Sequence, residues 1–212
     1  MRASTFFGLG LALTAALTLL ALVAIPFMPD QIPIHWNIRG EIDGYASRWT
    51  TLIFSPGLLL FGLGLAAAIP AMSPSGYRVQ RFGPTFYAIM FIVQAMFAYI
   101  ATLLILAGLT PRLDISRWLI AGILIALGLL GNLMGRTRRN FFVGIRTPWT
   151  LASDEVWTRT HRFGGRLMFA TGVLGGLAIA AGAPPMPVFV TVMAAVLYPI
   201  FYSYWIWRQV GN

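Results

Sequence analysis

Cysteine is absent from this chain, and charged residues are few. The lack of cysteine excludes disulfides, thiol nucleophiles and cysteine-based zinc sites. Lysine is also absent, because all fifteen basic residues are arginine, and only six acids and two histidines accompany them. Charged residues make up 10% of the chain, whereas a soluble domain carries roughly a quarter. The low share of charged residues indicates that the chain is not an ordinary soluble domain.

Long apolar runs take the place of the missing charge. Hydrophobic residues form 58% of the sequence, and a span of the bilayer needs roughly 20 of them in a row. Six runs meet this requirement, at about 5–28, 51–71, 85–108, 117–135, 166–183 and 187–207. The first run resembles a secretory signal peptide, but its apolar part is longer than a signal core and its cleavage site is weak. The sequence therefore predicts an all-α membrane protein, a single integral domain over residues 1–212 with six transmembrane helices.

The arginines predict the orientation of these spans. With the N-terminus inside, eleven arginines face the cytoplasm and four face outward, as the positive-inside rule requires. Both termini are then cytoplasmic, residues 29–50 form an external cap, and residues 136–165 form a cytoplasmic loop with an amphipathic helix. The net charge of +9 lies at the span ends, so it indicates membrane topology rather than direct nucleic-acid binding.

The spans themselves hold few polar groups. Gln94 lies in the third and Asn132 near the inner end of the fourth. Ion-coupled transporters place acids or bases at mid-depth, so their absence argues against that class. The spacings Gly131-x-x-x-Gly135 and Gly172-x-x-x-Gly176 permit close helix contact. They predict tight packing between spans four and five, with a dimer face as the alternative.

The external segment combines extended and polar residues. Ile32 and Ile34 alternate with polar neighbours, which favours a short strand, and Gly40 and Gly44 permit tight turns. Four polar side chains close in sequence could converge there: His35, Asn37, Glu41 and Asp43. Three interpretations are open for this segment. It is a folded cap with Trp36, Tyr45 and Trp49 at headgroup level, a partner-binding surface, or a cation site built from oxygen and nitrogen ligands.

The cytoplasmic segment contains seven of the fifteen arginines, between Arg136 and Arg166. Thr147 precedes a proline and should be extended. Ser153 is a candidate helix N-cap with two acids in the turn after it. Apolar residues then recur at helical spacing, which predicts a short amphipathic helix lying along the inner surface before the fifth span, with Trp157 and His161 on one face.

Three roles are open for this cytoplasmic segment. Its arginines could bind anionic lipids, at about 1 kcal/mol each, or its Arg/Trp/His surface could dock a cytoplasmic protein. A third role is catalysis with His161 as the base. No nucleophile is arranged with His161, and His35 is expected across the membrane, so the sequence favours a protein that is not an enzyme and has no cofactor or metal.

Two motifs carry a resemblance to a known family. The run GN-x-M-x-x-x-x-x-N-x-x-x-GIRTPWTL, followed by VW-x-x-THR-x-x-G, spans Gly131 to Gly165. It resembles the signature of the SdpI-type bacterial immunity proteins. The external motif IP-x-HWN-x-x-G-x-x-D-x-Y-x-S-x-W, from Ile32 to Trp49, resembles a small domain of unknown function that often precedes that signature. The two motifs divide the chain into an N-terminal unit, 1–75, and a C-terminal unit, 115–212.

The resemblance implies a multi-pass protein of the bacterial plasma membrane that confers immunity. The best-known member protects cells from a peptide toxin secreted by their own population, and with toxin present it holds a transcriptional repressor at the membrane. For this chain the implied partners are a peptide toxin or similar membrane-active ligand, a cytoplasmic repressor and anionic lipids. A transporter or pore for a small amphiphile or peptide is the alternative. The residues expected to bind ligand or partner are His35, Trp36, Asn37, Asp43, Asn132, Asn140, Arg146, Thr147, Trp149, Trp157 and His161.

Overall fold

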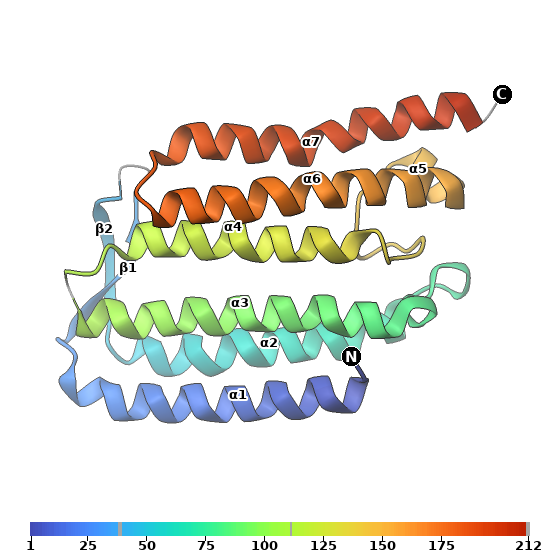
Figure 1. Ribbon diagram of the computed structural model, residues 1–212. Coiled ribbons are helices and arrows are strands. Elements are labelled where there is room, and N and C mark those ends of the chain that lie inside the picture. The colour runs from blue at the N-terminus through green and yellow to red at the C-terminus, as the bar shows by residue number, and fades with distance from the viewer. Residues whose placement is uncertain (38–39, 111, 211–212) are drawn as a thin grey trace.

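Six long helices run side by side between two polar ends (Figure 1). The computed structural model describes residues 1–37, 40–110 and 112–210. The long helices are α1 (Ala3–Ala24), α2 (Thr50–Met72), α3 (Gly83–Leu109), α4 (Ile115–Met134), α6 (Asp154–Ala180) and α7 (Pro185–Val210). The shortest has 20 residues, which at 1.5 Å per residue matches a hydrocarbon core about 30 Å thick. All six are long and apolar enough to cross a membrane, so the six predicted spans are confirmed.

The short elements lie at the two ends of these helices. At one end, the hairpin end, β1 (Gln31–Trp36) and β2 (Ile42–Ser47) follow the short helix η1 (Ile25–Phe27). At the other, the signature end, lie η2 (Ser75–Tyr77), η3 (Val79–Phe82) and α5 (Pro148–Ala152). Both chain termini are at the signature end (Figure 1). The assignment of this end to the cytoplasm stays a prediction from the arginines.

The helices form two groups. Helices α1, α2 and α3 each contact the other two, whereas α6 packs between α4 and α7. The groups meet mainly where α3 packs against α4. Helix α3 thus belongs with the first group, although it lies outside both predicted units. The division into units 1–75 and 115–212 itself stays a prediction.

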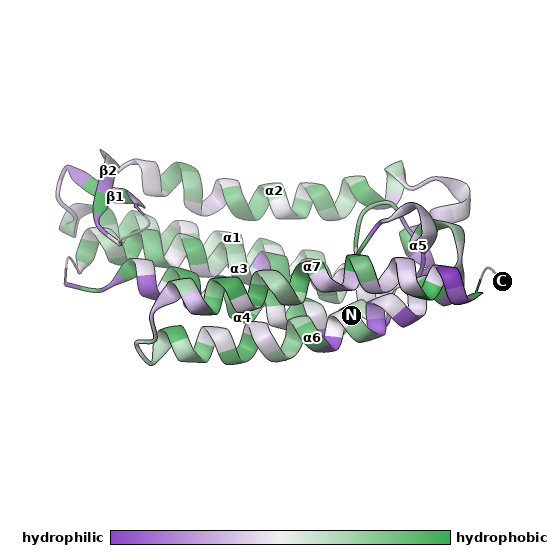
Figure 2. Ribbon diagram, turned by 90° about the horizontal axis from the view of Figure 1, so that it is seen from above, coloured by the Kyte–Doolittle hydropathy of each residue, from purple (hydrophilic) through white to green (hydrophobic). Residues whose placement is uncertain are grey.

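Apolar side chains cover the outside of the helices as well as the inside. Large apolar residues such as Leu19, Phe61 and Phe201 are more than half exposed. The middle of each helix is hydrophobic and the hydrophilic residues gather at the two ends (Figure 2). Such a surface is stable in lipid, where exposed leucine and phenylalanine carry no hydration cost. The protein is therefore a multi-pass membrane protein.

A line of glycines joins α4 to α6. A Cβ on Gly172 would lie 2.7 Å from the Leu124 carbonyl oxygen, and one on Gly176 would lie 2.8 Å from the Ala121 oxygen. Gly131 and Gly165 also face each other across this contact. Their missing side chains let the two backbones touch, so the predicted tight packing of spans four and five is confirmed.

The start of α6 differs in one respect from the sequence prediction. Ser153 caps the helix by accepting a hydrogen bond from the Val156 amide, with Asp154 and Glu155 in the first turn, as predicted. The helix then continues without a break to Ala180. The prediction of a separate amphipathic helix along the inner surface was wrong. Helical geometry persists because residues 154–180 contain no proline and α4 and α7 support both sides of the helix.

Candidate functional site

The hairpin is fixed to the helices beneath it. Its strands pair antiparallel, from Gln31 opposite Ser47 to Trp36 opposite Ile42, so the predicted strand is confirmed. Ile32 is completely buried in a cluster with residues of α1 and α3. Arg48 donates to the Met28 carbonyl at 3.0 Å and pairs with Asp30 at 3.3 Å. The hairpin is therefore a rigid cap that holds its outward side chains in place.

The polar side chains of the hairpin converge as two pairs. His35 Nδ1 lies 2.5 Å from Asp43 Oδ1. Asn37 donates to Glu41 Oε2 at 2.8 Å and accepts from the Glu41 amide at 3.1 Å. Gly44 lies opposite His35, where a Cβ would press on the His35 side chain. The His35 side chain is 69% exposed, which makes the pair accessible to a ligand from water.

A largely apolar cavity opens beside this pair. Its volume is about 580 Å³, within the range of roughly 300–1,000 Å³ that ligand sites occupy. Its lining residues come from β1, α4 and the start of α7: Ile34, His35, Trp36, Asn37, Ser116, Leu119, Ile120, Pro184, Pro185, Met186 and Phe189. A second apolar hollow of about 180 Å³ lies under the hairpin, between α2, α3 and α4. Trp36 lines both hollows, so it stands at the centre of the candidate ligand site.

At the signature end, Asn140 organises the loop after α4. It is completely buried. Its side-chain amide donates to the carbonyls of Arg138 and Val143, and its oxygen accepts from the amides of Phe142 and Val143, at 2.7 to 3.0 Å. These bonds satisfy its amide group inside the protein. Asn140 therefore positions the loop and leaves the neighbouring arginines on its surface.

His161 is a second buried anchor for the same loop. It is fully buried and stacks on Trp157 at 3.9 Å between ring centroids. Its Nδ1 faces the Trp157 carbonyl at 2.7 Å, and its Nε2 accepts from the Ile145 amide at 2.8 Å. The ring is thus neutral with the proton on Nδ1, because the two partners are an acceptor and a donor. Both nitrogens are occupied, so His161 has no lone pair for a catalytic proton transfer.

The segment between α4 and α6, residues 135–153, includes α5 and is called the signature loop below; it also binds to α7. Thr147 is extended before Pro148, as predicted, and forms a capping box with Thr150. Trp149 Nε1 donates to Ser203 Oγ of α7 at 2.5 Å. Trp157 Nε1 donates to Thr137 Oγ1 at 3.3 Å. The polar atoms of Asn140, Trp149, Trp157 and His161 are thus engaged inside the protein.

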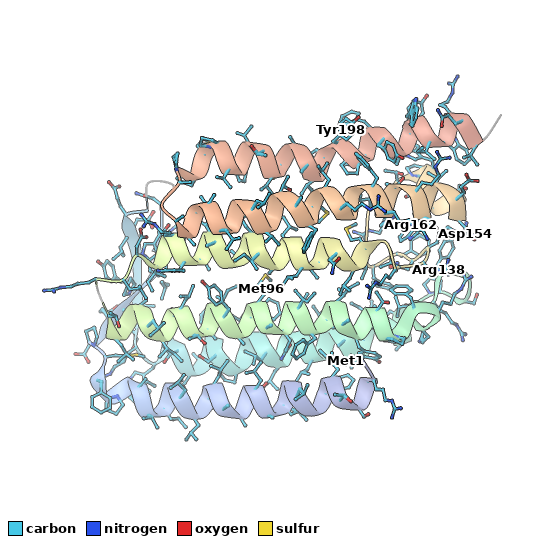
Figure 3. The ribbon with its side chains drawn as sticks, in the orientation of Figure 1. Met1, Met96, Arg138, Asp154, Arg162 and Tyr198 are labelled. Carbon is cyan, nitrogen blue, oxygen red and sulfur yellow. The ribbon has the colours of Figure 1, made fainter. Side chains whose placement is uncertain are left out.

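Two of the expected partner-binding residues remain on the surface at this end, Asn132 and Arg146. The Arg146 guanidinium donates to the Phe141 carbonyl, and this hydrogen bond holds the Arg146 side chain back along the loop. Figure 3 shows Arg138, Asp154 and Arg162 gathered at the same end of the molecule. The signature thus combines a buried hydrogen-bonded framework with an exposed set of arginines.

Sequence reasoning did not select three residues that shape this end: Gly144, Thr150 and Ser203. Gly144 has φ +118°, and a Cβ there would collide with the His161 ring. Thr150 lies in the quoted motif, and its hydroxyl donates to the Ile145 carbonyl at 2.8 Å. Turn-forming residues close together, here Gly144 and Pro148, could have predicted the turn that Gly144 and Thr150 shape. Ser203 had none, because it lies in an ordinary apolar span.

Comparisons with known proteins agree with the two motifs. Residues 136–203 match the SdpI/YfhL protein family, and residues 12–60 match a domain of unknown function, DUF1648. The immunity protein SdpI of Bacillus subtilis (strain 168) is 25% identical over 158 residues, covering 74% of this chain and 72% of the relative. No solved structure matches the chain.

Proposed function

The chain is a multi-pass bacterial membrane protein of the SdpI family, and from this premise we propose that it is an immunity protein that captures an amphipathic peptide toxin at the hairpin end. The observation that supports capture is the cavity of about 580 Å³ between β1, α4 and α7. Binding and shielding the peptide is the whole action, with no covalent step.

The two sides of the cavity suit a peptide with two faces. His35, Asn37 and Ser116 form a polar edge, whereas Leu119, Ile120, Met186 and Phe189 form an apolar wall. Phe189 is 58% exposed, so the apolar wall continues onto the lipid-facing surface. A membrane-active peptide approaching along the bilayer would place apolar anchors against the wall and polar groups against His35 and Asn37. The volume accommodates a few side chains rather than a whole peptide.

The signature end is the proposed site for the cytoplasmic repressor. The loop around Asn140 and His161 is held rigidly, and it exposes Arg138, Phe141 and Arg146. Exposed arginine and aromatic side chains are enriched at protein interfaces. Membrane co-fractionation of a helix-turn-helix regulator encoded beside this gene, lost in an Arg138→Glu/Arg146→Glu variant, is the test of this second partner.

Capture is tested by toxin survival. Cells that produce the protein are challenged with secreted peptides from dense cultures of the same organism, and survival is compared with that of cells without the gene. Trp36→Ala should abolish protection, because Trp36 lines the cavity. Trp49→Ala is the matched control, since Trp49 lies at the hairpin end and is 56% exposed.

Because Trp36 also contacts the core near α3 and α4, a second variant separates binding from folding. Ser116→Phe adds a ring to the cavity from the first turn of α4, and should remove protection at normal membrane abundance. Protection unaffected by both changes contradicts capture at this site. Peptide transport by the purified protein in liposomes would replace capture with export.

A further inference from the structure

We propose that the groove between α4 and α6 at the signature end is a specific site for the phosphate headgroup of an anionic lipid. The groove encloses about 410 Å³. Its lining comes from the end of α4, the residues just after it, and the first half of α6: Gly131, Asn132, Gly135, Arg136, His161, Arg162, Gly165, Arg166 and Phe169. This site is separate from the hairpin cavity and does not depend on the peptide.

The charges in the groove are uncompensated. Over residues 1–37, 40–110 and 112–210, none of the ion pairs involves Arg136, Arg162 or Arg166. The two acids at this end already form ion pairs with other arginines. Asp154 binds Arg139 at 2.7 Å and Glu155 binds Arg159 at 3.3 Å. Three guanidinium groups around one hollow are therefore available to an anion from outside the protein, and phosphate suits their forked geometry.

Glycines bring these arginines together. Gly131 and Gly165 form the floor, where the α4 and α6 backbones touch, and a Cβ on Gly135 would lie 3.2 Å from the Arg162 side chain. Close helix contact lets Arg136, just after α4, and Arg162 and Arg166 of α6 reach the same ligand. Larger side chains at the glycine positions would both fill the groove and separate its walls.

The surroundings of the groove indicate a lipid rather than a free anion. Arg162 and Arg166 are one turn apart, and Phe169 continues the same face toward the middle of the helix. Phe169 is 40% exposed and Leu129 of α4 is 42% exposed. A ligand spanning this face meets arginines first and apolar side chains next, which is the order of groups in an anionic phospholipid.

The distribution of charge over the whole chain agrees with this assignment. Among the residues that the structure describes, eleven arginines and two acids lie at the signature end, whereas three arginines and four acids lie at the hairpin end, so the positive excess belongs to the signature end. Bulk attraction to an anionic leaflet follows from that excess alone. The groove adds a site in which three of these arginines act on one headgroup.

The experiment compares two charge-matched triple variants. Arg136→Gln/Arg162→Gln/Arg166→Gln empties the groove of charge. Arg2→Gln/Arg78→Gln/Arg81→Gln removes the same charge from exposed positions of the same end. The full chain is purified in neutral detergent, where no bilayer surface potential acts, and titrated with phosphatidylglycerol while the bound lipid is counted by native mass spectrometry.

We expect the groove variant to bind phosphatidylglycerol at least tenfold more weakly, about 1.4 kcal/mol, and the control to bind as the original protein does. Equal weakening in the two variants would mean that only bulk charge matters and would overturn the proposal. Displacement of the lipid by millimolar inorganic phosphate would assign the groove to a free anion and overturn the lipid assignment. If the triple groove variant does not elute as a folded protein, the single variants Arg166→Gln and Arg78→Gln repeat the comparison with equal loss of charge.

Discussion

Replacing Gly172 by alanine should weaken the contact between α4 and α6 far more than the same change elsewhere in the bundle. The new Cβ would lie 2.7 Å from the Gly128 nitrogen and the Leu124 oxygen, and 2.8 Å from the Gly128 Cα. All three atoms are backbone, so no side-chain rotation can relieve the contact. The two helices must separate by roughly 1 Å to restore ordinary van der Waals distances of about 3.5–4.0 Å.

The magnitude follows from comparison with Gly64→Ala. Gly64 lies within α2 and a Cβ there would meet nothing within 4 Å. Both variants gain the helix preference of alanine over glycine, about 1 kcal/mol, and this term cancels in the difference. What remains is the cost of overpacking, roughly 1–3 kcal/mol. Gly172→Ala should therefore be less stable than Gly64→Ala by that amount.

Unfolding in mixed detergent micelles measures this difference. Helical circular dichroism is followed as a denaturing detergent replaces a mild one, for the original protein and both variants. Equal midpoints for Gly172→Ala and Gly64→Ala would refute the reasoning, because the α4–α6 contact could then accept a methyl group without cost. Weaker lipid binding in the groove should accompany the destabilisation, since separating α4 from α6 at Gly172 also moves apart Gly131 and Gly165 of the groove floor.

Two further predictions concern the signature loop. His161→Ala should lower the free energy of unfolding by about 3 kcal/mol or more, because the partly buried Ile145 amide loses its acceptor and a cavity replaces the buried ring. His35→Ala, at an exposed pair, should leave the free energy of unfolding nearly unchanged in the same micelle assay. Trp149→Phe and Ser203→Ala each remove the same hydrogen bond between the loop and α7, so the double variant should be less destabilised than the sum of the two single ones by roughly 0.5–1.5 kcal/mol. Additive effects in that cycle would show that the bond contributes nothing.

The spans were predictable because each is limited by polar or turn-forming residues and because the bilayer fixes the length of an apolar helix. The glycine contact was also predictable, since Gly172 and Gly176 fall one turn apart on a helix and this spacing of small residues permits close helix contact. The hairpin strand followed from the alternation at Ile32 and Ile34. All of these rest on local periodicity.

What escaped prediction depends on contacts between distant segments. The role of Ser203 is set by Trp149, 54 residues away in sequence, and nothing near Ser203 indicates that contact. The hollow beside Trp36 exists because the start of α7 lies across from β1. No residue spacing in the sequence predicts that these two segments are close. The break expected between the amphipathic segment and the fifth span was wrong for a related reason. The segment around His161 looked like a surface helix, but Trp157, Thr160 and His161 are buried against other parts of the same protein.

The continuous α6 changes how the two ends can communicate. Its first turns carry Trp157 and His161, which hold the signature loop, and its last residues lead into Pro184 and Pro185 of the hairpin cavity. A surface helix separated from the span would move independently of the cavity, whereas a single helix in backbone contact with α4 moves as one body with its partner. A peptide bound as proposed would touch the start of α4, which belongs to this body, and the start of α7 beside it. If the proposed peptide favoured one placement of these helices over another, the change would reach the signature end by two routes. One is the glycine contact between α4 and α6, and the other is α7, which holds Trp149 through Ser203.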